Sequence, residues 1–328
     1  LNGEGKDGEK VGAYFDALER EVLGWSHKII AHGSRVRSLY LGGGTPFAIP
    51  LRKLEEVIRF LRKTLPFIEN PSICVETSPR STLQEEAVDK LEMLVNLGVN
   101  RMSVGVQSFD FDSLRDMART FPGHTPLDEE AAVRRLLHSG IQNINVDMIQ
   151  DLPVTNSGLI GRLSHDLQTI ARLKPQHVTW YNLRLRPETT YARRNAEIVG
   201  EEESLLTRLT IWNFMERIGY VVLEGDRFAL AEGYEDQFRQ TRGSVETDLL
   251  GMGVSAYSHI GGYFFRNSTV IGGQVRADSR EATEKYMHSV REKGHAISLS
   301  RELTPLEKLA GTFALGLKKG VDLGKVEE

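Results

Sequence analysis

The chain has 328 residues, of which 40% are hydrophobic and 26% charged, and its formal net charge is −4. The length fits one large α/β domain with an appendage, and the charge argues against a general nucleic-acid binder. No apolar run approaches the roughly 20 residues that cross a membrane, and the polar start "LNGEGKDGEK" is not a signal peptide. We therefore expect a cytoplasmic protein that binds neither nucleic acid nor membranes.

Short β-type runs alternate with longer amphipathic patterns through the first two thirds of the chain. The predicted strands are "SLYL" (38–41), "ICVET" (73–77), "RMSVGVQ" (101–107), "INVDMI" (144–149) and "HVTWYNL" (177–183). Apolar residues at helical spacing predict helices over about 10–31, 51–65, 85–98, 128–140 and 164–175. Such alternation is typical of a parallel sheet with helices outside. Because the first helix needs a strand before it, we expect a partial (β/α)6 TIM-like barrel whose first strand precedes Leu1.

The pattern changes after Gly219. The run "YVVLEGDRFAL" (220–230) predicts one strand, and "TDLLGMGVSAYSHIGGYFFRN" (247–267) predicts turns and short strands. Two further helical patterns follow, near 280–293 and 304–317. We therefore expect a barrel over 1–222 and a C-terminal α+β extension over 223–328 that covers the barrel mouth.

Each predicted strand ends with small or polar residues. Ligands of parallel α/β folds bind at the carboxyl ends of the strands, so these residues predict one site at the barrel mouth. The set comprises Gly42, Gly43, Gly44, Thr45, Glu76, Gln107, Asp147, Asn182 and Arg184. Two structural alternatives remain open: the glycine triplet could be a flexible surface loop, and Asp147 could cap a following turn.

Searches for other chemistry are negative. The nine histidines show no HExxH spacing, and neither GxSxG nor GxxxxGK[ST] occurs. The segment "GMGVSAYS" (251–258) lacks the third glycine of a dinucleotide loop. Cys74 is the only cysteine, which excludes an intrachain disulfide, and its apolar surroundings predict a core residue.

Five segments together resemble the radical SAM enzymes, and most closely the oxygen-independent coproporphyrinogen III dehydrogenases and their homologues. They are "LYLGGGTP", "ICVETSP", "GVNRMSVGVQSF", "INVDMIQDLP" and "TDLLGMGVSAYS". The resemblance covers nearly the whole chain, from about Val11 to Asp322. It implies S-adenosylmethionine (SAM) and a [4Fe–4S] cluster as cofactors, with two SAM molecules bound.

The resemblance also assigns roles to single residues. Gly43, Gly44 and Thr45, next to Gly42, would hold the amino and carboxyl groups of the first SAM, and Glu76 would contact that molecule. Tyr257 falls near a contact of its adenine. The second SAM would be held by residues matching Gln107, Arg119, Asp147 and Arg184. Arg119 has an alternative role, a surface ion pair with Asp116 or another surface acid on its helix.

The chain departs from the family in its cysteines. The motif CxxxCxxC, whose three thiolates bind the cluster, is absent from the sequence, although relatives carry it just before the helix that matches "AYFDALEREV". We expect this loop upstream of Leu1. A homologue that has lost its cluster is the alternative.

Other departures concern the substrate. The dehydrogenase motifs "DHFA", "YGLP" and "NYAHLP" become "DRFA" with Arg227, "QDLP" with Gln150 and Asp151, and "NLRLRP". These positions are expected to line the barrel mouth, which puts a porphyrinogen substrate in doubt. The leading hypothesis is therefore transfer of a methyl or methylene carbon from the second SAM to an sp² carbon of a small molecule. This would be C-methylation or cyclopropane formation.

Two further hypotheses remain: oxidative decarboxylation of coproporphyrinogen III propionates, and a non-enzymatic haem-binding chaperone. For either enzyme, the resemblance implies an electron donor such as flavodoxin or ferredoxin and a small-molecule substrate. We expect a monomer.

Overall fold

The computed structural model describes residues 6–117, 119, 125–152, 158–183, 199–230, 234, 247–267, 270–271, 274–275 and 280–308. The chain forms two compact units. The sheet unit comprises Leu39–Glu56 and Ser72–Glu235, and the terminal unit comprises Leu1–Ser38, Val57–Pro71 and Asp236–Glu328. The first helix therefore groups with the C-terminal segment, and the sheet unit extends beyond residue 222.

The main sheet has seven strands in the order β1-β2-β3-β4-β5-β7-β6. Strands β2 to β5 are parallel, and β7 runs antiparallel to both of its neighbours. This is the mainly parallel α/β sheet that the sequence predicts. The bounds are β1 Val36–Leu41, β2 Phe67–Thr77, β3 Arg101–Gln107, β4 Asn143–Gln150, β5 His177–Asn182, β6 Val221–Glu224 and β7 Arg227–Ala229.

The run 220–230 differs from its prediction. It forms the hairpin of β6 and β7 instead of one strand, because the chain turns at Gly225 and Asp226. The expected boundary at 222 consequently falls inside β6, which belongs to the main sheet.

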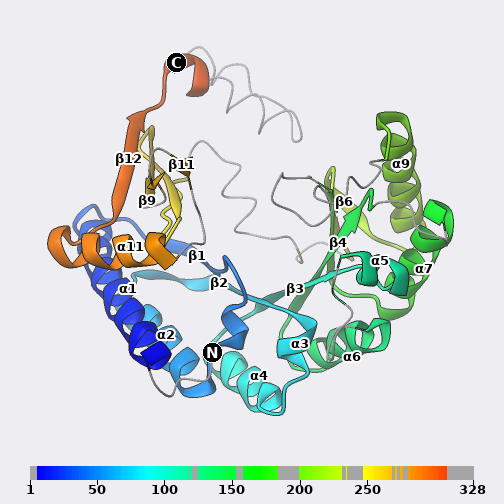
Figure 1. Ribbon diagram of the computed structural model, residues 1–328, viewed down its shortest axis with the longest axis horizontal. Helices are drawn as coiled ribbons and strands as arrows, with labels where there is room; N and C mark the ends of the chain where they lie inside the picture. The colour runs from blue at the N-terminus through cyan, green and yellow to red at the C-terminus, as the bar shows by residue number, and fades with distance from the viewer. Residues whose placement is uncertain are drawn as a thin grey trace. The chain divides into compact units, whose positions relative to one another are not determined.

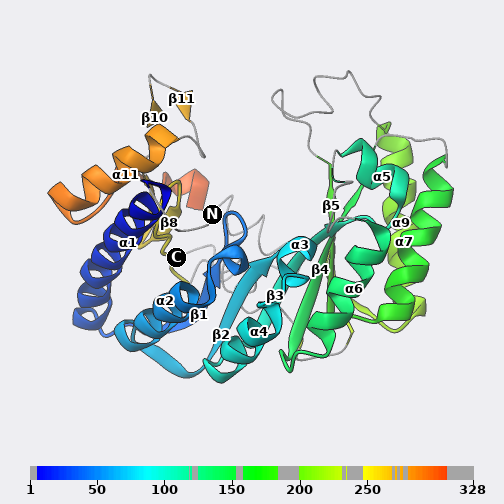
Figure 2. The ribbon, with the colours of Figure 1, turned by 60° about the horizontal axis from the view of Figure 1, so that its bottom comes forward.

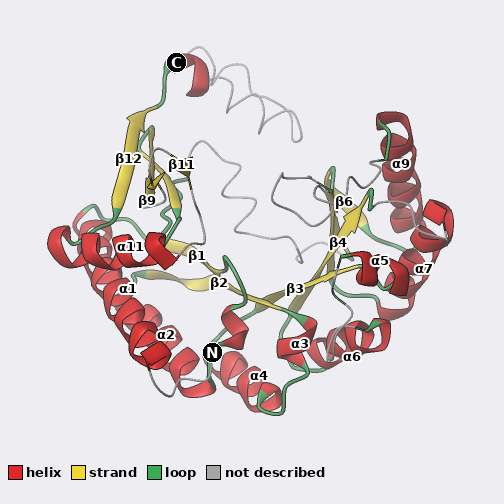
Figure 3. Ribbon diagram, viewed as in Figure 1, coloured by secondary structure: helices red, strands yellow, loops and turns green. Residues whose placement is uncertain are grey.

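Helices α4, α6, α7 and α9 follow one face of strands β2 to β5 (Figures 1 and 3). Alternate strand residues face this layer and are fully buried, among them Val104, Val146 and Val178. Their burial supplies the hydrophobic stabilisation of the sheet unit. The helices of the barrel are α2 Leu51–Thr64, α3 Pro79–Thr82, α4 Ala87–Asn96, α5 Phe111–Asp116, α6 Pro126–Leu137, α7 Gly158–Leu173 and α9 Glu201–Arg217, with the short 3₁₀ helix η1 at Pro46–Ala48.

The terminal unit packs helix α1 (Lys6–Ala31) against α11 (Arg280–Lys293), as Figure 2 shows. Ala17, Tyr286 and Val290 form a buried cluster between them. A three-stranded antiparallel sheet has the order β12-β9-β8, with bounds Ile297–Glu302, Tyr263–Asn267 and Tyr257–Ile260. A short pair, β10 (Val270–Ile271) and β11 (Gln274–Val275), lies between β9 and α11 in the sequence.

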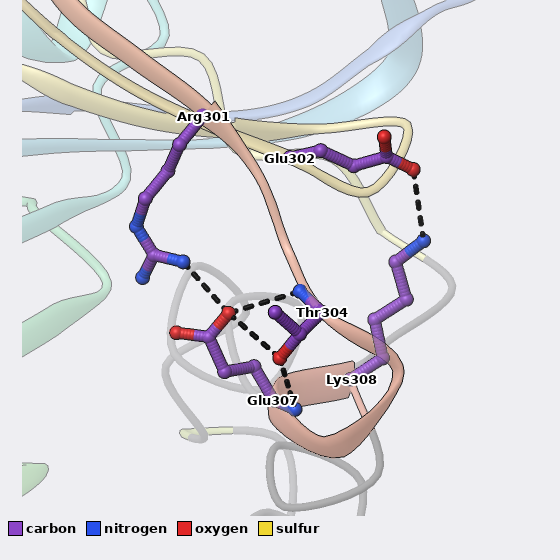
Figure 4. A network of polar contacts seen from close by, with 5 residues as sticks. All are labelled: Arg301, Glu302, Thr304, Glu307 and Lys308. Carbon is purple, nitrogen blue, oxygen red and sulfur yellow. Dashed lines mark hydrogen bonds and ion pairs between the residues drawn. The ribbon is translucent and has the colours of Figure 1, made fainter.

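A network of polar contacts follows β12 (Figure 4). Glu307 Oε2 accepts from Arg301 Nη1 at 2.7 Å and from the Thr304 N–H at 2.9 Å, while Thr304 Oγ1 accepts from the Glu307 N–H at 3.2 Å. Lys308 contacts Glu302 at 3.7 Å. This reciprocal cap starts a helical turn at 305–308; the rest of the helix predicted over 304–317 lies outside the described residues.

Within the described ranges, no helix combines the length and apolarity needed to cross a membrane.

Candidate functional site

The glycine triplet leaves β1 beside Glu76, the last inward-facing residue of β2. The Gly43 N–H donates to Glu76 Oε2 at 3.0 Å, and the Tyr40 hydroxyl donates to Glu76 Oε1 at 2.7 Å. A Cβ on Gly42 would lie 2.9 Å from the same carboxylate, and Gly43 has a φ of 87°. The first glycine is therefore required by close approach and the second by its backbone conformation.

The triplet presents free space to a ligand. A Cβ added to Gly43 or Gly44 would meet no atom within 4 Å. The following Thr45 is half-buried and precedes η1, and the fully buried Lys90 donates to the Phe47 carbonyl of η1 at 3.3 Å. Helix α4, which carries Lys90, thus anchors the η1 segment that follows the glycine triplet. These contacts favour an ordered ligand-binding loop over a flexible surface loop.

The second group of predicted residues converges on Gly105 of β3. Asp147 on β4 is the register partner of Gly105, and Arg119 donates from Nη1 to the Gly105 carbonyl at 3.1 Å. A Cβ on Gly105 would lie 2.8 Å from Gln107 Nε2. The structure therefore brings Gln107, Arg119 and Asp147 together from three segments of the sheet unit.

The electrostatic partner of Arg119 is a residue that sequence reasoning missed. Glu129, in the first turn of α6, is fully buried, and burial raises its pKa to about 9, while the charge of Arg119 opposes that rise. Asp116, the alternative partner, lies against Arg115 at 3.6 Å. Glu129 stands between two other acids in "DEE", so no sequence signal distinguished it.

Asp147 belongs to a polar network on the inner face of the sheet, the face opposite the buried valines. Register aligns Glu76, Ser103, Asn145 and His177 in one row across β2 to β5. Ser103 Oγ donates to Asp147 Oδ2 at 2.8 Å, and Asn145 Nδ2 donates to Asp147 Oδ1 at 2.8 Å. The period-two alternation of polar residues in β3, β4 and β5 was the signal that could have revealed most of this row.

The side chain of Asp147 does not cap a turn, because its two oxygens accept hydrogen bonds from side chains of β3 and β4. Burial raises the pKa of its carboxyl group, and the bonds from Ser103 and Asn145 oppose that rise. The Arg101 charge also lowers this pKa, whereas the charge of Glu76 raises it.

Two residues expected at the barrel mouth lie elsewhere. Gln150 and Asp151 are buried and bond to each other, and the Ser204 hydroxyl of α9 donates to Asp151 Oδ2 at 2.7 Å. They therefore tie β4 to the outer helix layer. Asp151 has a φ of 59°, a left-handed conformation that Asp tolerates better than most residues. Arg227, by contrast, pairs with Thr179 in register and shares its inner face.

The remaining predicted positions are Tyr257 and Arg184. Tyr257 begins β8 in the terminal unit, where its ring stacks on Phe264 at a centroid distance of 6.5 Å. Arg184 lies outside the described residues.

The described residues contain no group of three His, Cys, Asp or Glu side chains that could bind a metal. Cys74, the one cysteine of the sequence, is buried on β2, with Arg101 Nη1 at 3.5 Å from its Sγ. A cluster held by three thiolates does not fit this set. The carboxylates of Glu76 and Asp147, in contrast, accept hydrogen bonds and suit the amino and ribose groups of a ligand. The open side of the glycine triplet leaves room for the carboxyl group of the ligand.

Comparisons with known proteins identify the family of the chain. A family model described as the radical SAM superfamily matches residues 9–183. The heme chaperone HemW of Bacillus subtilis is 27% identical over 323 residues, covering 97% of this chain and 78% of the relative. The oxygen-independent coproporphyrinogen III oxidase of Escherichia coli is 28% identical over 305 residues, covering 88% of this chain and 61% of that enzyme.

A solved structure is similar over almost the whole chain. Coproporphyrinogen III oxidase (HemN) from Escherichia coli, described as a radical SAM enzyme, matches with a TM-score of 0.78 at 25% identity. The match covers 98% of this chain and 72% of HemN.

Proposed function

The chain belongs to the radical SAM superfamily, whose members use SAM and a [4Fe–4S] cluster, and on that premise we propose that it binds two SAM molecules. The observation that carries the proposal is the presence of two neighbouring polar groups on the inner face and mouth of one sheet. One surrounds Gly43 and Glu76, and the other surrounds Gly105.

The first group is proposed to bind the SAM that is cleaved. Tyr40 and Gly43 hold Glu76 as a hydrogen-bond acceptor, so its carboxylate suits an ammonium or hydroxyl group. The open side of Gly43 and Gly44 leaves room for the amino-acid end of the ligand. The described residues offer no thiolate set for the cluster, so the proposal assigns roles only to SAM-binding groups.

The second group is proposed to bind the SAM that donates carbon. Arg119 can pair with a carboxylate through two parallel bonds, a geometry that Lys does not reproduce. Asp147 accepts bonds and therefore suits ribose hydroxyls or an ammonium group. Transfer of a methyl or methylene carbon to an sp² carbon of the substrate is the proposed reaction.

A second candidate is oxidative decarboxylation of propionate side chains, as the name of the coproporphyrinogen oxidase relative suggests. The outward position of Gln150 and Asp151 favours this candidate, because it removes one reason to doubt a porphyrinogen substrate. Haem binding without turnover, suggested by the HemW relative, is the third.

Anaerobic turnover of the protein after reconstitution with iron and sulfide, with methyl-labelled SAM as substrate, tests the proposal. Arg119→Ala should leave SAM cleavage largely intact and abolish both S-adenosylhomocysteine formation and labelling of the product. Arg115→Ala is the matched control, because Arg115 lies on the same segment with its side chain 49% exposed and pairs with Asp112.

Three outcomes separate the candidates. Label in the product supports carbon transfer, whereas release of CO2 from coproporphyrinogen III without label supports decarboxylation. Tight stoichiometric haem binding without SAM turnover supports the chaperone. Normal labelling by Arg119→Ala would contradict the assignment of Arg119.

A further inference from the structure

The carboxylate of Asp147 is held from one side by its own sheet. Asn145 lies two residues earlier on β4 and donates to one carboxylate oxygen, and Ser103 on β3 donates to the other. Asn145 Nδ2 also donates to Ser103 Oγ at 2.7 Å, which closes a triangle of three side chains. Asn145 and Ser103 are both buried.

The chemistry of these groups fixes the orientation of the Asn145 amide. A carboxylate only accepts hydrogen bonds, so the amide nitrogen must face Asp147. The amide oxygen then faces His177 Nδ1 at 2.5 Å and Thr179 Oγ1 at 3.0 Å. His177 must therefore carry its proton on Nδ1 and donate it, as Thr179 does with its hydroxyl.

The direction of every bond in this network leads to Asp147. His177 and Thr179 donate to Asn145, and Asn145 and Ser103 donate to Asp147. Both carboxylate oxygens thereby receive a donor from the sheet, and the lone pairs that remain can only accept. A ligand group that meets Asp147 has to be a donor.

We propose that Asn145 is a positioning residue of the second SAM site, which His177 and Thr179 lock so that it presents Asp147 as an acceptor for a ribose diol or an ammonium group. The inference rests on the proposed function and deepens it, because it names the residue that aims Asp147 and the class of ligand group that Asp147 takes.

The electrostatics around Asp147 support the proposal. Burial raises the pKa of its carboxyl group, and the bonds from Ser103 and Asn145 lower it. Among the described residues, other charged or titratable groups near it are Arg101, Glu76, Tyr40 and, through Asn145, His177. Arg119 donates to the carbonyl of Gly105, the register partner of Asp147. Without Asn145 the carboxyl group would protonate at higher pH and would itself become a donor.

Binding of S-adenosylhomocysteine to the protein, measured by calorimetry, tests the proposal without turnover. Asn145→Ala should weaken binding roughly 10- to 100-fold, the effect of losing one charge-assisted hydrogen bond that aligns the acceptor. Asn143→Ala is the matched control, because Asn143 is a buried amide on the same strand and face. Its Nδ2 donates to the Tyr234 carbonyl at 2.8 Å and does not contact Asp147. The affinity of Asn143→Ala for S-adenosylhomocysteine should equal that of the wild type.

Asn145→Asp provides a second readout that general damage to the fold would not produce. The wild type should lose affinity as pH falls, because Asp147 becomes protonated. In the variant, the introduced carboxylate repels Asp147 at neutral pH, and a proton shared between the two restores the bond on acidification. Its affinity should therefore rise as pH falls from about 8 to about 5.

The outcomes test the role of Asn145 separately from the existence of the second SAM site. Equal affinity of Asn145→Ala and wild type, or parallel pH profiles of Asn145→Asp and wild type, would overturn the positioning role while leaving the two-SAM proposal intact. Absence of S-adenosylhomocysteine binding by the wild type would overturn the second site itself. An inverted pH profile of Asn145→Asp supports the proposal even if Asn145→Ala fails to fold.

Discussion

The buried carboxylate of Glu21 connects three distant segments of the terminal unit. Glu21 lies on α1 and is fully buried. Its Oε2 accepts from the Gly253 N–H at 2.9 Å and from the Tyr286 hydroxyl at 2.7 Å, and its Oε1 accepts from Asn267 Nδ2 at 2.8 Å. The donors come from the "GMG" loop, β9 and α11. We predict that Glu21→Ala destabilises this unit selectively.

The expected magnitude follows from the groups left behind. Each buried donor that loses its acceptor costs about 1–3 kcal/mol, and three donors are affected. The Tyr286 hydroxyl can rotate to another acceptor, so the costs do not add fully, and we expect a total of about 3–5 kcal/mol. Asp16→Ala on the exposed face of the same helix should change stability by less than about 0.5 kcal/mol.

Hydrogen exchange of the Gly253 amide reports the effect locally, because this N–H is itself bonded to Glu21. A loss of 3–5 kcal/mol should accelerate its exchange by roughly 150- to 5000-fold, with little change in the amides of β3 and β4. The fluorescence of Trp25, which stacks on Phe265 at 5.6 Å, provides a second probe. Equal exchange rates of the Gly253 amide in Glu21→Ala and Asp16→Ala would refute the claim that Glu21 stabilises the terminal unit.

Three further predictions concern single sites. Gly251→Ala should strongly destabilise the terminal unit in urea unfolding, because the added Cβ would lie 2.3 Å from the Tyr257 carbonyl oxygen; a midpoint like that of the wild type would contradict this. Burial raises the pKa of Asp166 to about 7, so this group stabilises the fold at low pH and its contribution is lost as pH rises from about 4 to 7. Asp166→Asn should flatten that part of the stability profile, and an unchanged slope would count against it. Glu129→Gln should change stability by less than about 1 kcal/mol at pH 7, since a carboxyl group whose pKa is about 9 is already neutral there; a large loss would show that the charged pair with Arg119 is needed.

The sequence predicted most of the sheet and the residues of the two polar groups proposed to bind SAM. Hydrophobic runs of strand length between amphipathic helices predicted β3 to β5 within one residue at each end and the carboxyl-terminal half of β2, because local periodicity reports which side of an element is buried. Polar residues in the carboxyl-terminal halves of such strands must lie toward one edge of a parallel sheet, and on this ground Glu76, Gln107 and Asp147 were predicted to lie close together. The family motifs added Arg119, whose position after α5 carries no periodic signal.

Only the tertiary structure decided which polar residues support that site. Asn145 and Ser103 meet through register between strands about 40 residues apart in the sequence, and Glu21 meets Gly253 across 232 positions. The turn at Gly225 and the outward direction of Asp151 likewise depend on what packs against them. A local pattern records the periodicity of burial, but hydrogen-bond partners are chosen by three-dimensional proximity, which one segment of sequence does not contain.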